Sequence, residues 1–120
     1  MKHMQISDRD IAKLERKSSQ AAALLKSISN KWRLLILCQL ARGEKSVGAI
    51  LDLLDLSQSA LSQHLAILRA NKLVSTRREA QTIYYSIRGS EAAAILTTLY
   101  DLYCGPSGPL SAPVKKRAKA

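Results

Sequence analysis

The sequence lacks the features that mark membrane proteins and secreted proteins. Its 120 residues include only two cysteines, and its longest uninterrupted apolar runs are five residues, such as 21–25 and 34–38. A membrane-spanning helix needs about 20 apolar residues, and a secreted disulfide scaffold needs more cysteines. The N-terminal stretch MKHMQISDRD has no apolar core of the kind a signal peptide requires. We therefore expect a cytoplasmic protein that makes no contact with membranes.

Motifs for catalysis and for cofactor binding are also missing. The sequence has no C-x-x-C pair, no glycine-rich phosphate loop, and no histidine close to either cysteine. A zinc or soft-metal site needs several Cys, His or carboxylate groups that converge, and Cys38 and Cys104 alone would make a poor one. Aromatic residues make up only 4% of the chain, which disfavours stacking on RNA bases. We expect neither an enzyme nor a site for a metal or cofactor.

Acidic residues are scarce relative to basic ones. Nineteen Lys and Arg stand against nine Asp and Glu, which gives a net charge of +10 and a pI near 10.0. The excess is spread along the chain, and 105–120 holds basic residues and no acidic ones. A basic domain of this size most often binds nucleic acid. We expect one domain over 1–104 and a flexible basic tail over 105–120, which either adds nonspecific attraction to phosphate or has no function.

The spacing of apolar residues predicts five helices. The expected starts and stops are residues that cap helices or tolerate a positive φ. Ser7 or Asp8, Ser46, Ser57 and Ser90 are the expected N-caps, and Ser29-Asn30, Gly43 and Asn71 are the expected stops. The helices are expected over 8–29, 31–41, 47–54, 57–70 and 90–104.

The hydrophobic period then changes from 3.6 to 2 within one segment. The runs 73–78 and 82–87 are rich in β-branched and aromatic residues, and 79–81 separates them. This pattern is typical of a β-hairpin. The expected fold is therefore mainly α with a small hairpin (α+β), in the order α-α-α-α-β-β-α. Two short helices joined by a tight turn and followed by a basic hairpin indicate a winged helix-turn-helix.

The helix over 57–70 has a surface that suits a DNA major groove. When its leucines are buried, the opposite face is polar, small and uncharged. Ser and Gln can approach base edges closely and form hydrogen bonds with them, although an inert amphipathic helix would have the same pattern. His64 lies beside the buried stripe, where it either packs or contacts a phosphate. The candidate DNA contacts of this helix are Gln58, Ser59, Ser62, Gln63 and His64.

The hairpin supplies a second set of candidate DNA contacts. Arg77 and Arg78 lie next to its tip, and Gln81 lies on the far side. Arginines on a short projecting hairpin suit phosphates or a minor groove. Alternatively, charge at this position keeps a sheet edge from aggregating.

The stretch from Asn30 to Ile87 carries a family resemblance. Together with its flanks, over about 20–104, it resembles the ArsR/SmtB family of bacterial winged-helix repressors, and LSQSALSQHLAILR (56–69) is its most specific part. The resemblance implies a homodimer built on the first and last helices that binds double-stranded operator DNA and releases it when an inducer arrives. One departure is Ala80, where relatives usually have glycine in the hairpin tip.

The two cysteines acquire a role only through this resemblance. Cysteines at the positions of Cys38 and Cys104 mark a branch of persulfide-sensing repressors that includes the biofilm-growth-associated type. The branch implies that the reduced dimer represses, and that a reactive sulfur species bridges the thiols by a disulfide or polysulfide and releases the DNA. The alternative is an ArsR-type repressor with another inducer, peroxide or a metal, whose cysteines are structural.

We also expect Cys38 to be the thiol that attacks first. Arg42 lies one turn beyond it, and Lys31 and Arg33 are near in sequence, so neighbouring charge would lower its pKa. Cys104 lies at a helix C-terminus, where the helix dipole disfavours an anion. Cys104 would then be the resolving thiol.

Overall fold

The computed structural model describes residues 5–105, so the expected tail over 105–120 lies outside the described residues except for Gly105. The described chain is a winged helix-turn-helix, as the sequence predicts, with one strand more than expected. Its elements are α1 (Asp8–Ile28), α2 (Lys31–Ala41), β1 (Lys45–Ser46), α3 (Val47–Leu53), α4 (Gln58–Ala70), β2 (Val74–Glu79), β3 (Thr82–Ile87) and α5 (Glu91–Tyr103).

Side-chain caps begin the first four helices. Ser7 and Asp10 form a reciprocal capping box at α1, and Asn30 accepts hydrogen bonds from the first backbone amides of α2. Ser46 and Ser57 cap α3 and α4 as predicted. Each cap satisfies amides that have no partner inside the helix, which stabilises a helix by about 1 kcal/mol.

Two of the predicted helix boundaries differ from the structure. Ser90 precedes α5 but forms no side-chain cap, and the carboxylate of Glu91 instead accepts a hydrogen bond from the Ser90 amide. After α4 the left-handed residue is Lys72, with φ 61°, whereas Asn71 has a negative φ. Asn71 still helps to end the helix, because its side-chain amide donates to the Ile67 carbonyl. Gly43 ends α2 with a φ of +142°, as expected of a glycine stop.

The hydrophobic core forms around α2. The apolar residues of α2 pack against α4, α5 and β3. This helix therefore lies between the helix-turn-helix, which is formed by α3 and α4, and the last helix, α5. Leu61, Leu65 and Leu68 of α4 are buried in this core, as the sequence pattern predicts. The most deeply buried large side chains are Ile36, Leu37, Ile50, Leu61, Leu65, Leu68 and Val74.

The hairpin belongs to a three-stranded antiparallel sheet with the order β1-β3-β2. β1 pairs Lys45 with Tyr85, a contact that the local sequence pattern does not predict. Glu79 pairs with Thr82, so the tip has two residues, Ala80 and Gln81, rather than the expected three. Ala80 has a φ of 55°, a left-handed conformation that glycine adopts without the strain that a Cβ causes.

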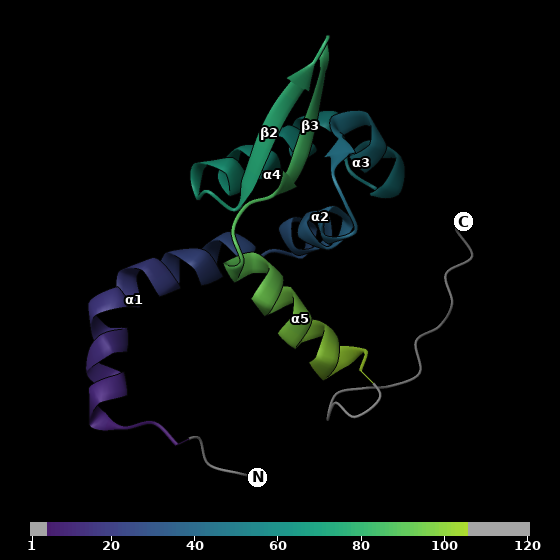
Figure 1. Cartoon of the computed structure of the whole chain (residues 1–120). Coiled ribbons are helices and arrows are strands. Elements are labelled where there is room, and N and C mark those ends of the chain that lie inside the picture. The colour runs from purple at the N-terminus through teal and green to yellow at the C-terminus, as the bar shows by residue number, and fades with distance from the viewer. Residues whose placement is uncertain (1–4, 106–120) are drawn as a thin grey trace.

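The hairpin and the two outer helices point to opposite ends of the molecule (Figure 1). β2 and β3 project on one side together with α3 and α4, whereas the N-terminal end of α1 and the C-terminal end of α5 project on the other. Most side chains of α1 before Ala21 are exposed in the single chain. The two ends therefore offer separate surfaces, one next to the β2–β3 hairpin, which is the wing of this fold, and one along α1 and α5.

The tip conformation leads to a test of stability. We expect Ala80→Gly to stabilise the protein by about 1 kcal/mol, because a left-handed conformation costs alanine roughly that much. Urea unfolding at equilibrium measures the change. Ala93→Gly, on the exposed side of α5, is the control and is expected to destabilise by about 1 kcal/mol. An Ala80→Gly protein no more stable than the parent would contradict the strain inferred at the tip.

Candidate nucleic-acid interface and cysteine pair

The outward face of α4 has the composition and exposure that the sequence predicts. Gln58, Ser59, Ser62 and Gln63 are all exposed, and the buried leucines lie on the other side of the helix. Their amide and hydroxyl groups can donate and accept hydrogen bonds with base edges. The structure therefore brings four of the predicted α4 contacts onto one accessible surface.

His64 lies apart from that surface. Its ring is partly buried, and Arg33 Nη1 lies 3.4 Å from His64 Nδ1, which accepts the hydrogen bond in the neutral tautomer that carries its proton on Nε2. Desolvation and then the charge of Arg33 lower the pKa of His64. Arg33 also donates to the carbonyls of Ser27 and Lys26 at the end of α1. His64 therefore belongs to a polar link between α1, α2 and α4, which is the packed role that the sequence leaves open for it.

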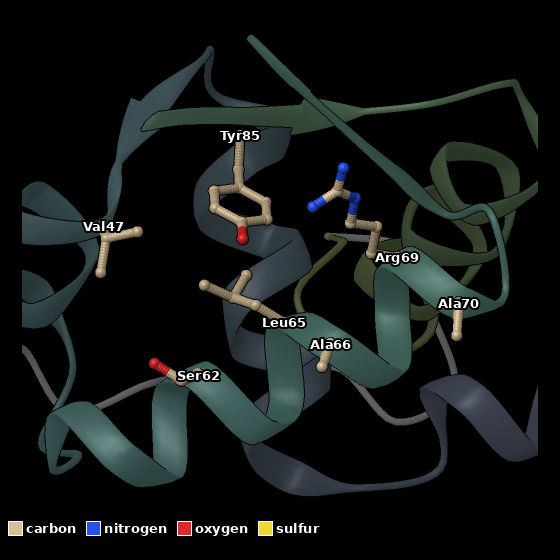
Figure 2. A pocket seen from close by; sticks show the side chains of 7 residues that line it. All are labelled: Val47, Ser62, Leu65, Ala66, Arg69, Ala70 and Tyr85. Carbon is tan, nitrogen blue, oxygen red and sulfur yellow. The ribbon is translucent and has the colours of Figure 1, made fainter. Parts of the chain in front are cut away.

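A groove of about 370 Å³ separates α4 from the hairpin (Figure 2). The Arg69 side chain reaches from α4 toward the hairpin, on the side where the Tyr85 ring comes down from β3. Arg69 is not among the predicted contacts, although helical spacing from Ser62 and Ala66 places it on their side of the helix. The lining residues are Val47, Ser62, Leu65, Ala66, Arg69, Ala70 and Tyr85.

The two hairpin arginines lie on opposite faces of the sheet. Arg77 is opposite Tyr84 in the register, and its guanidinium lies 4.5 Å from the centroid of that ring. Arg78 alternates to the face that carries Tyr85, the side of the groove. Gln81 is exposed at the tip. The structure thus separates a pair of residues that the sequence places together.

Cys38 and Cys104 come close enough for their charges to interact. Cys38 lies on α2 and Cys104 is the C-cap of α5, and both thiols are free and exposed. Desolvation raises the pKa of Cys38, and the Cys104 thiolate raises it further. The expected lowering of this pKa is therefore wrong. The Arg33 side chain is directed toward the end of α1 and His64, so its charge does not lower the pKa of the Cys38 thiol.

The backbone at the end of α5 fixes the position of Cys104. The amides of Cys104 and Gly105 both donate to the Tyr100 carbonyl, at 2.7 and 2.9 Å. Gly105 is buried, and a Cβ built on it would lie 2.8 Å from the Asp101 carbonyl oxygen. A glycine is therefore required immediately after the thiol for the chain to turn at this point.

The described residues offer no alternative metal-based site. Between residues 5 and 105 there is no cluster of three or more His, Cys, Asp or Glu side chains that could hold a metal ion. In the same part of the chain, no helix is both long enough and apolar enough to cross a membrane.

Comparison with known proteins identifies the family. The family model for bacterial regulatory proteins of the arsR family matches residues 30–76. The transcriptional activator HlyU of Vibrio cholerae is 45% identical over 104 residues, which cover 87% of this chain and 96% of HlyU. The chain belongs to the ArsR family. The biofilm growth-associated repressor of Agrobacterium fabrum is 38% identical over 105 residues, covering 88% of this chain and 90% of the repressor.

The fold of this ArsR-family regulator also agrees with a solved structure. Reduced HlyU from Vibrio cholerae N16961 is 50% identical, and the superposition has a TM-score of 0.72 over 77% of this chain and 97% of that chain. The chain is a DNA-binding regulator of transcription, a function that is not enzymatic. The α4 face and the hairpin are accordingly the surfaces to consider for DNA.

The pKa of Cys38 provides a test of how near the two thiols lie. At neutral pH the raised pKa leaves Cys38 with less thiolate than an ordinary cysteine has. The rate of alkylation should therefore keep rising with pH above about 8.5, the pKa of an ordinary cysteine. Because Cys104 contributes to the rise, Cys104→Ser should shift the rate profile of Cys38 to lower pH. Iodoacetamide labelling read by mass spectrometry gives the profile for Cys38 alone. Thr98→Ser serves as the control, and an identical profile in all three proteins would contradict the proximity.

Proposed function

We propose that this regulator is a homodimeric repressor whose release from operator DNA is switched by a bridge between Cys38 and Cys104. Reactive sulfur species are the proposed inducers. The observation that carries the proposal is that two free, exposed cysteines lie on helix α2 and at the end of helix α5, which are far apart in the sequence but pack against each other. Beyond desolvation, the charge of Cys104 also raises the pKa of Cys38, which supports their proximity. The similarity to a biofilm growth-associated repressor and to a HlyU solved in a reduced form gives further support.

The bridging chemistry balances with a persulfide as the oxidant. One thiolate attacks the sulfane sulfur of a persulfide R–S–SH, which leaves a cysteine persulfide and a thiol R–SH. The second thiolate attacks the cysteine sulfur of that persulfide, so that a disulfide forms and H₂S leaves. A second equivalent of persulfide gives a trisulfide by the same displacements. The raised pKa of Cys38 removes the reason for naming it the first nucleophile, so the order of attack is not part of the proposal.

The packing of α2 explains how a bridge would change DNA binding. α2 carries Cys38 and packs against α4, the helix with the predicted base contacts, and against α5, which ends at Cys104. A covalent bridge between α2 and α5 would change how the two helices pack and thereby the position of α4. Allosteric coupling of about 1–3 kcal/mol changes affinity about 5–150-fold.

Exposed apolar side chains support a dimer through α1 and α5. Leu14 and Leu25 of α1 are 55% and 59% exposed, and Tyr100 of α5 is 61% exposed. An apolar groove of about 570 Å³ lies between these helices and the start of α2, and Leu25, Leu34 and Leu99 are among its lining residues. Extended apolar surface of this kind marks an interface. A two-fold dimer would place two copies of α4 on a palindromic site.

The dimer interface is tested by Leu25→Glu. A charge in the apolar groove should convert the protein to a monomer, which sedimentation velocity detects as a halved mass. Leu53→Glu is the control, because it introduces the same charge at an exposed leucine outside the groove. Leu53 lies on α3 and is 38% exposed, and its replacement should leave the mass unchanged. A Leu25→Glu protein that sediments like the parent would rule out this face as the interface.

The switch is tested by a DNA-binding titration on the upstream region of the gene. We expect tight binding by the reduced protein and a loss of about 5–150-fold after treatment with a persulfide, because the bridge alters α2 and α5. Cys38→Ser and Cys104→Ser proteins should stay bound under the same treatment. Mass spectrometry of the released protein should show a disulfide or polysulfide between the two cysteines.

The control treatments separate the inducers. Peroxide applied to the same complex should leave it bound if sulfur donors are the specific inducers. Release of the Cys38→Ser protein by persulfide would refute the switch. Binding that ignores every thiol treatment would leave a repressor with another inducer and structural cysteines.

A further inference from the structure

We propose that Arg69 and Arg78 contact the DNA phosphates next to the wing, and that Arg77 is a positioning residue that holds the wing instead. This inference rests on the DNA-binding function of the chain and is independent of the thiol switch. It assigns different roles to Arg77 and Arg78, which are adjacent in the sequence and lie on the same strand.

All three nitrogen atoms of the Arg77 guanidinium are occupied by carboxylates. Its Nε lies 2.9 Å from one oxygen of Glu44, and its Nη2 lies 2.9 Å from the other. Its Nη1 donates to Glu79 at 2.6 Å. The hydrogen bonds that Arg77 donates to Glu44 and then to Glu79 raise its pKa. The two carboxylates offset the positive charge of this guanidinium, so Arg77 adds little to the positive electrostatic potential that attracts DNA phosphates.

The Glu44 contact joins the wing to the connection after α2. Glu44 lies between α2 and β1, and β1 pairs with β3 on the edge opposite β2. The ion pair therefore spans the sheet across the ring of Tyr84. A bidentate arginine–carboxylate pair restricts both partners geometrically. This contact sets the position of the hairpin relative to α2.

Arg78 and Arg69 have a different environment. Within residues 5–105 neither side chain forms an ion pair. Arg78 shares the hairpin face of Tyr85, and Arg69 lines the groove that lies between Tyr85 and α4 (Figure 2). Ser62, on the exposed face of α4, lines the same groove. Two unneutralised cations beside a polar helix face fit the phosphates of one DNA strand.

The salt dependence of DNA binding tests this assignment on the reduced protein. Each lost phosphate contact should reduce the slope of log K against log salt by about 0.9 per bound chain. We expect that reduction in Arg69→Ala and in Arg78→Ala. Arg77→Ala should keep the parental slope while affinity falls about two- to fivefold, the range that breaking an exposed ion pair produces. A reduced slope in Arg77→Ala, or parental slopes in the other two, would overturn the assignment.

Glu44→Gln and Arg77→Lys distinguish a positioning role from a phosphate contact. If Arg77 positions the wing, Glu44→Gln weakens binding with an unchanged slope, and the Glu44→Gln/Arg77→Ala double variant binds no worse than either single variant. Arg77→Lys should also weaken binding, because lysine keeps the charge but cannot form the bidentate pair. Tighter binding with a steeper slope in Glu44→Gln would show that Arg77 is a restrained phosphate contact. Thermal melts verify that each variant is folded, and a parent that binds no DNA would refute the DNA-binding function itself.

Discussion

The burial of α2 is the interaction on which the rest of the structure depends. Ile36, Leu37 and Leu40 are almost completely buried, and full burial of such a side chain contributes about 1.5–3 kcal/mol. The helix packs against α4, α5 and β3, so its position determines where the helix with the predicted base contacts, the last helix and the wing strand lie. Cys38 lies on the exposed side of this same helix. A chemical change at its thiol therefore acts on the element that the whole core shares.

Polar contacts at both ends of α2 extend this central role. Near its start, Arg33 donates to carbonyls at the end of α1 and to His64 of α4. Beyond its end, Glu44 holds Arg77 of the wing. Directional contacts of this kind add little free energy at an exposed site, but they specify geometry. α2 is thus connected by polar contacts to the end of α1, to His64 of α4 and to the hairpin.

The sequence predicted well what depends on neighbouring residues along the chain. The helices of the helix-turn-helix, the hairpin and the outward face of α4 follow from apolar periodicity and from capping residues such as Ser46 and Ser57. β1 was missed because a two-residue strand has no local pattern and exists only through its pairing with β3. The prediction for Cys38 was wrong because cations near in sequence need not be near in space. Arg33 is directed elsewhere, and desolvation determines the shift in the thiol pKa.

The sequence by itself determined the order of the five helices and of the hairpin, the family, and the polar outward face of α4, because these follow from residue type and local spacing. Only the tertiary structure decided which residues act together. It brought Cys104 near Cys38, placed Arg69 and Tyr85 at one groove, and placed Glu44 against Arg77. These pairings depend on how the buried α2 packs with distant elements. Such packing is set by the shape of the whole core, and no local pattern encodes it.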